Sequence, residues 1–490
     1  MAHYLTLDQG TTSSRALVFD AVGRVVALAA HEFEQHFPAP GLVEHDPGEI
    51  LATQRRAMLE AWEAAGRPAI EAVGITNQRE TVVVFDRRTG EPIHRAIVWQ
   101  DRRTAGWLRQ HAAQAARIRE RTGLPLDPYF SASKIAWILD HVSGARAAAE
   151  RRELGAATID AWLVHRLTGG RVFATEPSNA SRTQLFDLHA FDWSDELCDL
   201  FGVPRAMLPE IRASAGDFGV VEGQDWPIRG VLGDQQAALF GHAAIESGDS
   251  KCTYGTGAFF LINAGSHVPT PPRGLLGTVA WDCGGSPTFA VEGSVMVAGA
   301  LVQWLRDGLG IIADAREIEQ LARSVPSSDE VVIVPAFAGL GTPHWDADAR
   351  GLIIGLTRGT TRAHLARASL EAMALQVDEV VRAAAEAAPM PSELRVDGGA
   401  TENDLLLELQ AAISGVPVVR PHHLETTALG ACRMAMLGAG VAASASELPE
   451  LPRPDRRVSP DELEIDRDAL LTRWSVAVER CKGWAAVGRS

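Results

Sequence analysis

Three aspartates, Asp8, Asp234 and Asp397, each close a short apolar segment and open a polar turn. Transfer of a phosphoryl group from a nucleotide needs a metal ion to bridge phosphate oxygens, amides or hydroxyls to hold them, and a base for the acceptor hydroxyl. Mg²⁺ keeps most of its waters and takes only one or two protein carboxylates, so a single aspartate at a hairpin is sufficient. These aspartates therefore indicate phosphoryl transfer to an alcohol.

Two glycine- and hydroxyl-rich turns could hold the phosphates. Residues 10–13 follow Asp8 with the sequence GTTS, and residues 255–257 repeat a Gly-Thr-Gly turn later in the chain. Such turns present unhindered amides and hydroxyls to an anion. Taken alone, an ordinary β-turn explains the first segment about as well.

Asp234 and the segment Gln78-Arg79-Glu80 are the candidates for handling the acceptor. Asp234 lies between an apolar strand and a helix, where it could be the general base, with Gln235 positioning a neighbouring hydroxyl. An N-cap role for Asp234 is equally compatible with this position. Arg79 and Glu80 offer donors and a carboxylate suited to vicinal hydroxyls, although a surface ion pair would also account for them.

The expected elements place these residues at strand ends. In the first half, apolar segments at 4–7, 16–19 and 24–26 predict an antiparallel meander, followed by a helix over 47–65 and strands at 72–75 and 81–85. The second half predicts strands and helices in alternation, which favours α/β layers. Its expected elements are a helix over 362–388, a strand at 394–396, a helix over 403–414, a strand at 416–419 and a helix from residue 426.

A weak internal repeat suggests two related domains. Residues 254–262 again place a Gly-Thr hairpin between apolar segments, just after the midpoint of the 490-residue chain, and a chain of this length usually forms more than one domain. We therefore expect domains at residues 1–247 and 248–490 that flank a central cleft. A chance turn at residues 255–257 is the alternative.

Composition excludes several classes of partner and site. The formal net charge of −16 disfavours nucleic acids and anionic lipids. The five cysteines form no C-x-x-C pair, and no lysine lies in a G-x-x-x-x-G-K-[ST] motif, so neither a disulfide framework, a zinc site nor a Walker-type loop is indicated. With neither a signal-like segment nor an apolar run of about 18 residues, we expect a cytoplasmic protein without stable membrane association.

Taken together, the ordered motifs resemble those of the FGGY carbohydrate kinase family. The resemblance implies an α/β fold of two ribonuclease-H-like domains, as in actin-like ATPases, closing on a central cleft. It extends to about residue 440 and leaves residues 441–490 without an assigned role. The motifs are LDQGTTSSR at 7–15, VEHDP at 43–47, GITNQRET at 74–81, IVWQDRRT at 97–104, DPYFS at 127–131, SNASRT at 178–183, GDQQAALFG at 233–241, TYGTG at 253–257, WD at 345–346, RG at 350–351 and RVDGGA at 395–400.

The same resemblance implies ATP-dependent phosphorylation of glycerol to sn-glycerol 3-phosphate, with Asp234 as the base and Asp8 helping to hold Mg²⁺. Residues implied to bind the glycerol hydroxyls are Arg79, Glu80, Tyr129, Asp234 and Gln235, with Trp99 and Phe259 packing against its carbons. Residues implied to bind the nucleotide are Thr11, Thr12, Ser13, Arg15, Thr256, Gly299, Gln303, Gly399 and Asn403.

Departures from the family pattern bear on regulation and substrate. Members inhibited by fructose 1,6-bisphosphate carry a glycine-rich basic loop before the catalytic segment, whereas residues 220–227 here are short and acidic, so we expect no such inhibition. Asp101 also occurs in sugar-specific relatives, which leaves another small polyol or a pentulose as the alternative acceptor. An actin-like or chaperone-like ATPase is the alternative from another class. The resemblance further implies a homo-oligomer, a dimer or tetramer.

Overall fold

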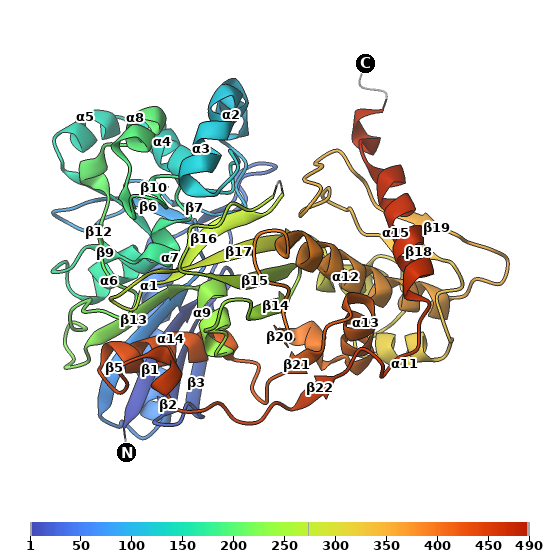
Figure 1. The fold of residues 1–490 in the computed structure, drawn as a ribbon. Coiled ribbons are helices and arrows are strands. Elements are labelled where there is room, and N and C mark those ends of the chain that lie inside the picture. The colour runs from blue at the N-terminus through green and yellow to red at the C-terminus, as the bar shows by residue number, and fades with distance from the viewer. Residues whose placement is uncertain (1, 273, 488–490) are drawn as a thin grey trace.

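The computed structural model describes residues 2–272 and 274–487, which form two lobes with a sheet in each (Figure 1). The sheet of the first lobe has five strands in the order β13-β5-β1-β2-β3. The first three strands form the expected antiparallel meander, and β5 and β13 add in parallel. Their bounds are β1 His3–Gln9, β2 Ser13–Asp20, β3 Val25–Glu32, β5 Ile70–Asn77 and β13 Ile228–Gly233.

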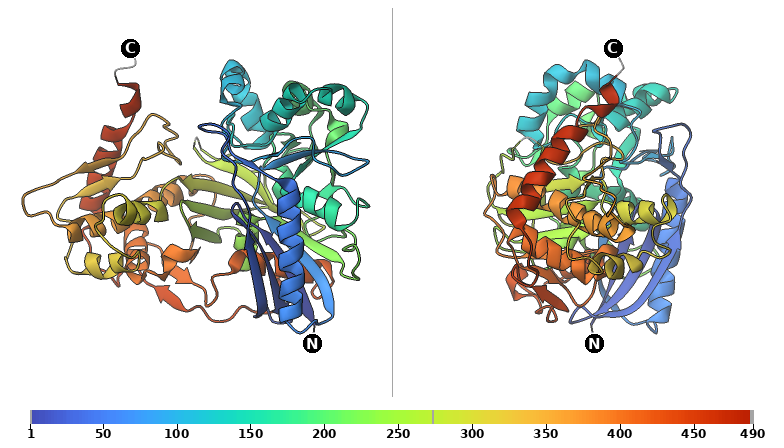
Figure 2. Two further views of the ribbon diagram at one scale, coloured as in Figure 1. Left: turned by 180° about the vertical axis from the view of Figure 1, so that it is seen from behind. Right: turned by 90° about the vertical axis from the view of Figure 1, so that its right-hand side faces the viewer.

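Helix α1, Pro47–Ala64, covers one face of this sheet and packs on β2 and β3 (Figure 2). Asp46 is its N-cap, since the Asp46 carboxylate accepts a hydrogen bond of 2.7 Å from the amide of Gly48. Pro47 occupies the first turn, where a missing N–H costs nothing. The helix confirms the expectation from residues 47–65.

The second sheet has seven strands in the order β16-β17-β15-β14-β20-β21-β22. Strands β14 and β15 form an antiparallel hairpin and β20 joins β14 in parallel, as β1, β2 and β5 do in the first sheet. The expected repeat of the Gly-Thr hairpin is therefore confirmed. The bounds are β14 Ser250–Tyr254, β15 Ala258–Gly265, β16 Leu276–Trp281, β17 Thr288–Val295, β20 Leu394–Asp397, β21 Val418–Arg420 and β22 Arg456–Val458.

Helices α12, Arg362–Ala384, and α13, Asp404–Ser414, pack together beside the second sheet. The structure ends α12 four residues before the expected end at residue 388. Strand β21 begins after Pro417 rather than at residue 416, because proline has no N–H to donate to the ladder.

The other strands form four small sheets. Their bounds are β4 Glu44–His45, β6 Val82–Asp86, β7 Ala96–Ile97 and β8 Leu154–Thr158 in one sheet, then the pairs β9 Ala174–Thr175 with β12 Glu210–Ile211, β10 Phe186–Asp187 with β11 Asp192–Trp193, and β18 Val332–Val334 with β19 Leu352–Ile354. The remaining α-helices are α2 Ala105–Gln110, α3 Ala115–Thr122, α4 Ala132–His141, α5 Ala145–Glu150, α6 Ile159–Leu167, α7 Pro177–Ala180, α8 Asp195–Phe201, α9 Asp234–Gly241, α10 Gly299–Asp307, α11 Glu317–Arg323, α14 Thr426–Gly438 and α15 Arg467–Cys481. In the described chain, none of the helices is both long and apolar enough to cross a bilayer.

Helix α14 comes from the second half of the sequence but packs on the first sheet, against β1, β5 and β13 (Figure 1). Its close approach requires glycine, because a Cβ on Gly74 would lie 2.3 Å from the carbonyl oxygen of Ala431. The expected boundary between residues 247 and 248 falls in the connection between α9 and β14. The chain therefore crosses between the lobes again after that boundary.

Candidate active site

Asp234 is the first residue of α9 and follows β13 directly. Gly233, not Asp234, is the N-cap, so the Asp234 carboxylate does not occupy the capping position. Instead it accepts from the amide of Gln235 at 2.7 Å and lies 3.2 Å from Nε of Arg79. Its side chain is 32% exposed. The N-cap interpretation of Asp234 is therefore wrong, and its role as the general base stays a prediction.

Burial raises the pKa of Asp234, and the Arg79 guanidinium beside it offsets part of that rise. A carboxylate whose pKa is shifted upward is a stronger base than an ordinary one. The upward shift therefore suits removal of a proton from an alcohol as it attacks.

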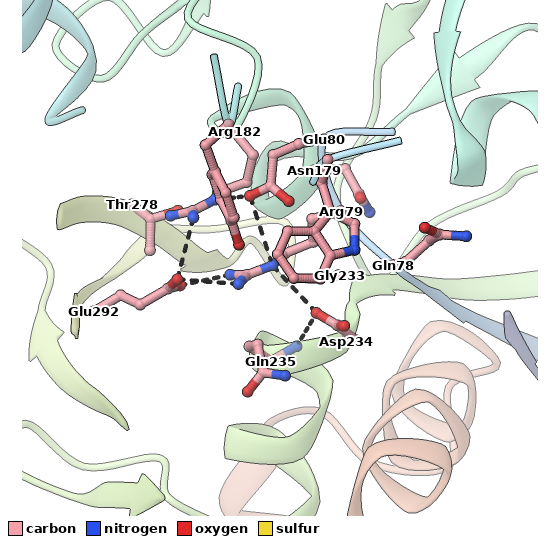
Figure 3. A network of polar contacts seen from close by, with 12 residues as sticks. Gln78, Arg79, Glu80, Asn179, Arg182, Gly233, Asp234, Gln235, Thr278 and Glu292 are labelled. Atoms are coloured by element: carbon pink, nitrogen blue, oxygen red, sulfur yellow. Dashed lines mark hydrogen bonds and ion pairs between the residues drawn. The ribbon is translucent and has the colours of Figure 1, made fainter. Parts of the chain in front are cut away.

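Arg79 lies in a buried ion-pair network that crosses between the two sheets (Figure 3). Its Nη1 and Nη2 contact the two carboxylate oxygens of Glu292, on β17, at 2.6 and 3.0 Å. Arg182 donates to the same carboxylate at 3.1 Å and to Glu80 at 2.6 Å. Since Arg79 is only 3% exposed, the surface ion pair considered for this segment is wrong.

Glu80 has a left-handed backbone, with φ of +61°, and is buried. Non-glycine residues adopt this conformation rarely, and it persists only where surrounding contacts enforce it. Burial raises the pKa of Glu80, and the guanidinium groups of Arg182 and Arg79 oppose that rise. The strained turn and the two cations fix this carboxylate in place beside Arg79.

Two aromatic rings stand near the polar network. Trp99 and Tyr129 pack edge to face with centroids 5.4 Å apart, and Nε1 of Trp99 donates to the hydroxyl of Thr11 at 3.1 Å. Lys134, fully buried on α4, donates to the carbonyl of Tyr129 at 2.7 Å and to that of Trp99 at 3.3 Å. Lys134 therefore fixes the backbone of both residues that carry the rings. Phe259, the third expected aromatic residue, lies half-buried on β15, opposite Thr253 of β14.

The first hairpin turn carries the expected phosphate-binding hydroxyls of Thr11, Thr12 and Ser13, and it is closed by a bond of 2.9 Å from the amide of Gly10 to the carbonyl of Ser13. Arg15 and Asp8 lie opposite one another on β2 and β1. Arg15 contacts Asp8 at 2.5 Å and Glu425 at 2.8 Å, so the structure gives it two carboxylate partners.

The five expected nucleotide residues of the second half line one cavity of about 520 Å³. They are Thr256, Gly299, Gln303, Gly399 and Asn403. The side-chain oxygen of Asn403 caps α13 by accepting from the amide of Leu406 at 3.0 Å, which leaves its amide nitrogen for a ligand. The first-hairpin residues lie outside the lining of this cavity.

Comparison with known proteins identifies the fold. The model of the FGGY family of carbohydrate kinases, N-terminal domain, matches residues 3–241, and that of the C-terminal domain matches residues 250–439. The chain belongs to the FGGY family of carbohydrate kinases. The resemblance described from the motifs is confirmed, and with it the expected pair of ribonuclease-H-like, actin-like domains.

Glycerol kinases are among the most similar relatives of this FGGY kinase. The chain is 54% identical to the glycerol kinase of Thermus brockianus, covering all of both chains. The crystal structure of Plasmodium falciparum glycerol kinase with ADP superposes with a TM-score of 0.92 at 34% identity, covering 98% of each chain. A ligand-bound xylulose kinase from Lactobacillus acidophilus, with a TM-score of 0.89 at 20% identity and 98% coverage of both chains, shares the fold.

Several side chains of this FGGY kinase's site received no role from the sequence. They are Lys134, Arg182, Lys251 and Glu292. The sequence held a signal for two of them, Glu292 and Lys251. Glu292 is a charged residue within an apolar segment, and such a residue must be paired if it is buried. Lys251 likewise lies in a short strand segment just before the Gly-Thr hairpin.

A magnesium ion, which the family chemistry implies, is compatible with the carboxylates present. In the described chain, no group of three or more His, Cys, Asp or Glu residues could hold a metal by itself. The hairpin carboxylate of Asp8 is a hard oxygen donor, suited to an ion that keeps most of its waters and binds substrate phosphates. The donor set therefore fits Mg²⁺ and offers no thiolate or imidazole cluster for a softer metal.

Proposed function

We propose that this protein transfers the terminal phosphoryl group of ATP to a terminal hydroxyl of glycerol, giving sn-glycerol 3-phosphate. The observation that carries the proposal is an ion-pair network that contacts both Asp234 and an aromatic pair, since Arg79 lies 3.2 Å from Asp234 and the Arg182 guanidinium lies 5.8 Å from the ring centre of Tyr129. Arg79 and Glu80 are fixed on one side by buried ion pairs, and Trp99 and Tyr129 form the apolar side. A short triol has hydroxyls for the first side and carbons for the second.

In this mechanism Asp234 accepts the proton of the attacking hydroxyl as that oxygen approaches the phosphorus in line with the leaving group. Arg79 and Glu80 hold the acceptor hydroxyls, since a site built for hydrogen bonding rejects an analogue that leaves its polar groups unpaired. Closure of the lobes excludes water, the competing acceptor.

The nucleotide occupies the cavity lined by Thr256, Gly299 and Asn403, with its phosphates directed towards the two Gly-Thr hairpins. Asp8, with substrate phosphates, would hold Mg²⁺. When bound, the ion neutralises charge on the phosphate oxygens. Arg15 is directed by Asp8 and Glu425, and we assign its guanidinium to the phosphate side of the cleft. We further propose that the enzyme acts in the cytoplasm as a homo-oligomer.

The test is a coupled ADP-release assay with glycerol, dihydroxyacetone, erythritol, ribulose and xylulose. Glycerol should give the highest kcat/KM, and ADP release without an acceptor should be negligible. A preference for a pentulose would refute glycerol as substrate while leaving the kinase chemistry. Rapid ADP release with water alone would support the ATPase alternative.

Asp234→Asn tests the base. General bases contribute about 10²–10⁴-fold to rate, so kcat should fall by that factor while ATP binding, measured by calorimetry, is retained. Asp225→Asn, on the exposed loop before β13, is the matched control and should behave as wild type. Unchanged turnover in Asp234→Asn would remove Asp234 from the base role.

A further inference from the structure

The chain has only three lysines, and one of them, Lys251, is fully buried beside the acceptor site. Lys251 lies on β14 of the second sheet, whereas Asp234 and Gln235 begin α9 after the first sheet. Its Nζ donates to Oε1 of Gln235 and, at 2.8 Å, to the hydroxyl of Thr253. A side chain from one lobe thus fixes a side chain of the other lobe, next to Asp234.

The chemistry of the two groups determines how the Gln235 amide is oriented. A lysine side chain donates up to three hydrogen bonds as the ammonium, so the group that faces it must be the amide oxygen. The NH₂ end of Gln235 then points away from Lys251, and within the described chain it has no hydrogen-bond acceptor. Gln235 is only partly buried and directly follows Asp234. Its free NH₂ therefore offers a donor next to the base.

We propose that Lys251 is a positioning residue that holds Gln235 with its NH₂ group directed at a hydroxyl oxygen of the acceptor. This inference rests on the proposed function, because it assigns the donor to the same polyol site. A freely rotating glutamine would present oxygen and nitrogen alternately, and a hydroxyl can accept from only one of them. Locking the amide makes the site select acceptors with an oxygen at that point.

The electrostatic setting agrees with this role. Burial lowers the pKa of Lys251, while the carboxylates of Asp397 and Asp234 favour its charged form. The guanidinium of Arg79 lies near the same group and opposes its charge. Lys251 therefore serves as a donor enclosed by protein, and its replacement removes one hydrogen-bond partner of Gln235.

The test is a double-mutant cycle on Lys251→Met and Gln235→Ala, with KM for glycerol and for ATP measured separately. Each single variant should raise KM for glycerol about tenfold, typical of one lost hydrogen bond to substrate, and leave KM for ATP within about twofold. The double variant should be no worse than Gln235→Ala alone, because both changes remove the same interaction. Multiplied effects, or an unchanged KM for glycerol in Lys251→Met, would overturn the proposal.

A second variant keeps the test decisive if Lys251→Met does not fold. Gln235→Glu retains an oxygen for Lys251 but loses the NH₂ donor, so it should fold and still raise KM for glycerol about tenfold. A Gln235→Glu enzyme with wild-type KM for glycerol would refute the donor role. Lys482→Met, which alters a partly exposed lysine paired with Glu479, is the control and should match wild type. Wild-type turnover of glycerol tests the proposed function separately.

Discussion

Glu292 joins the two lobes through its contacts with Arg79 and Arg182. Glu292→Gln should therefore lower both the stability of the protein and its affinity for glycerol. The glutamate is fully buried on β17, while both arginines come from the first half of the chain. Glutamine preserves the shape of the side chain but removes its charge. The two buried guanidinium groups then share one fewer carboxylate, and Arg79 loses the bidentate contact that orients it.

The pKa of Glu292 sets the size of the effect. Burial alone would raise it, but Arg182 and Arg79 outweigh burial and lower the pKa from its usual 4.5 to about 2. A difference of that size corresponds to about 3 kcal/mol at neutral pH. This contribution is present above the pKa of the unfolded chain and is lost as pH falls through the folded value. Loss of one partner of a buried ion pair costs about 3–5 kcal/mol in other proteins, which agrees.

Thermal denaturation and steady-state kinetics measure the two consequences. In domains of 150–250 residues, 1 kcal/mol lowers Tm by about 2–4 °C, so Glu292→Gln should melt about 6–12 °C below wild type. KM for glycerol should rise at least about tenfold because Arg79 is no longer fixed.

Glu371→Gln is the matched control for Glu292→Gln. It neutralises a buried glutamate whose partner, Arg367, lies on the same helix at 2.8 Å, and it should leave KM for glycerol unchanged. A Glu292→Gln enzyme that melts within about 2 °C of wild type, with the same KM for glycerol, would refute this account of the network.

Three further predictions concern pH, the aromatic pair and regulation. Burial raises the pKa of Asp234, and a base must be ionised to act. We therefore expect kcat/KM for glycerol to fall as pH decreases through a pKa above the ordinary aspartate value of about 4. A pH–rate profile without this decrease would contradict the prediction. Lys134→Met should raise KM for glycerol several-fold and spare KM for ATP, since Lys134 supports the carbonyls behind both aromatic rings, and equal effects on both substrates would argue for general misfolding. Low-millimolar fructose 1,6-bisphosphate should not inhibit, because the loop at 220–227 carries Glu222 and Asp225 and repels an anion; inhibition in the coupled assay would show that another site binds the sugar phosphate.

Local signals were sufficient to predict the elements that carry the site. Apolar segments separated by Gly-Thr turns predict the hairpins of β1–β2 and β14–β15, and the structure buries these strands on both faces. Asp46 and Pro47 mark the start of α1, and the helix ends at Ala64, one residue before its expected end at residue 65. The candidate residues lie at strand ends, with Asp8 near the end of β1, Arg79 two residues after β5 and Asp234 directly after β13. Predicting the strands therefore also predicted where those residues would lie.

The contacts between the lobes could not be predicted from these signals. Arg79 precedes Glu292 by 213 positions, and no periodicity relates residues that far apart. The sequence also did not predict which sheet α14 packs on, since its apolar faces suit either sheet. The close approaches that Gly74 permits to Ala431 and Gly230 to Ala435 indicate which sheet it covers, but a glycine inside a strand has several possible explanations.

The two interlobe contacts have a shared consequence for catalysis. Glu292 on β17 contacts Arg79, and Lys251 on β14 contacts Gln235, so two groups that we propose to face the acceptor are held by side chains of the second sheet. The cavity that we propose for the nucleotide is lined by residues of that same second lobe. Any displacement of the lobes therefore moves the supports of the acceptor site together with the nucleotide. In the proposed mechanism, the acceptor groups are held in place only while the second lobe keeps this position, so separation of the lobes should limit phosphoryl transfer to water.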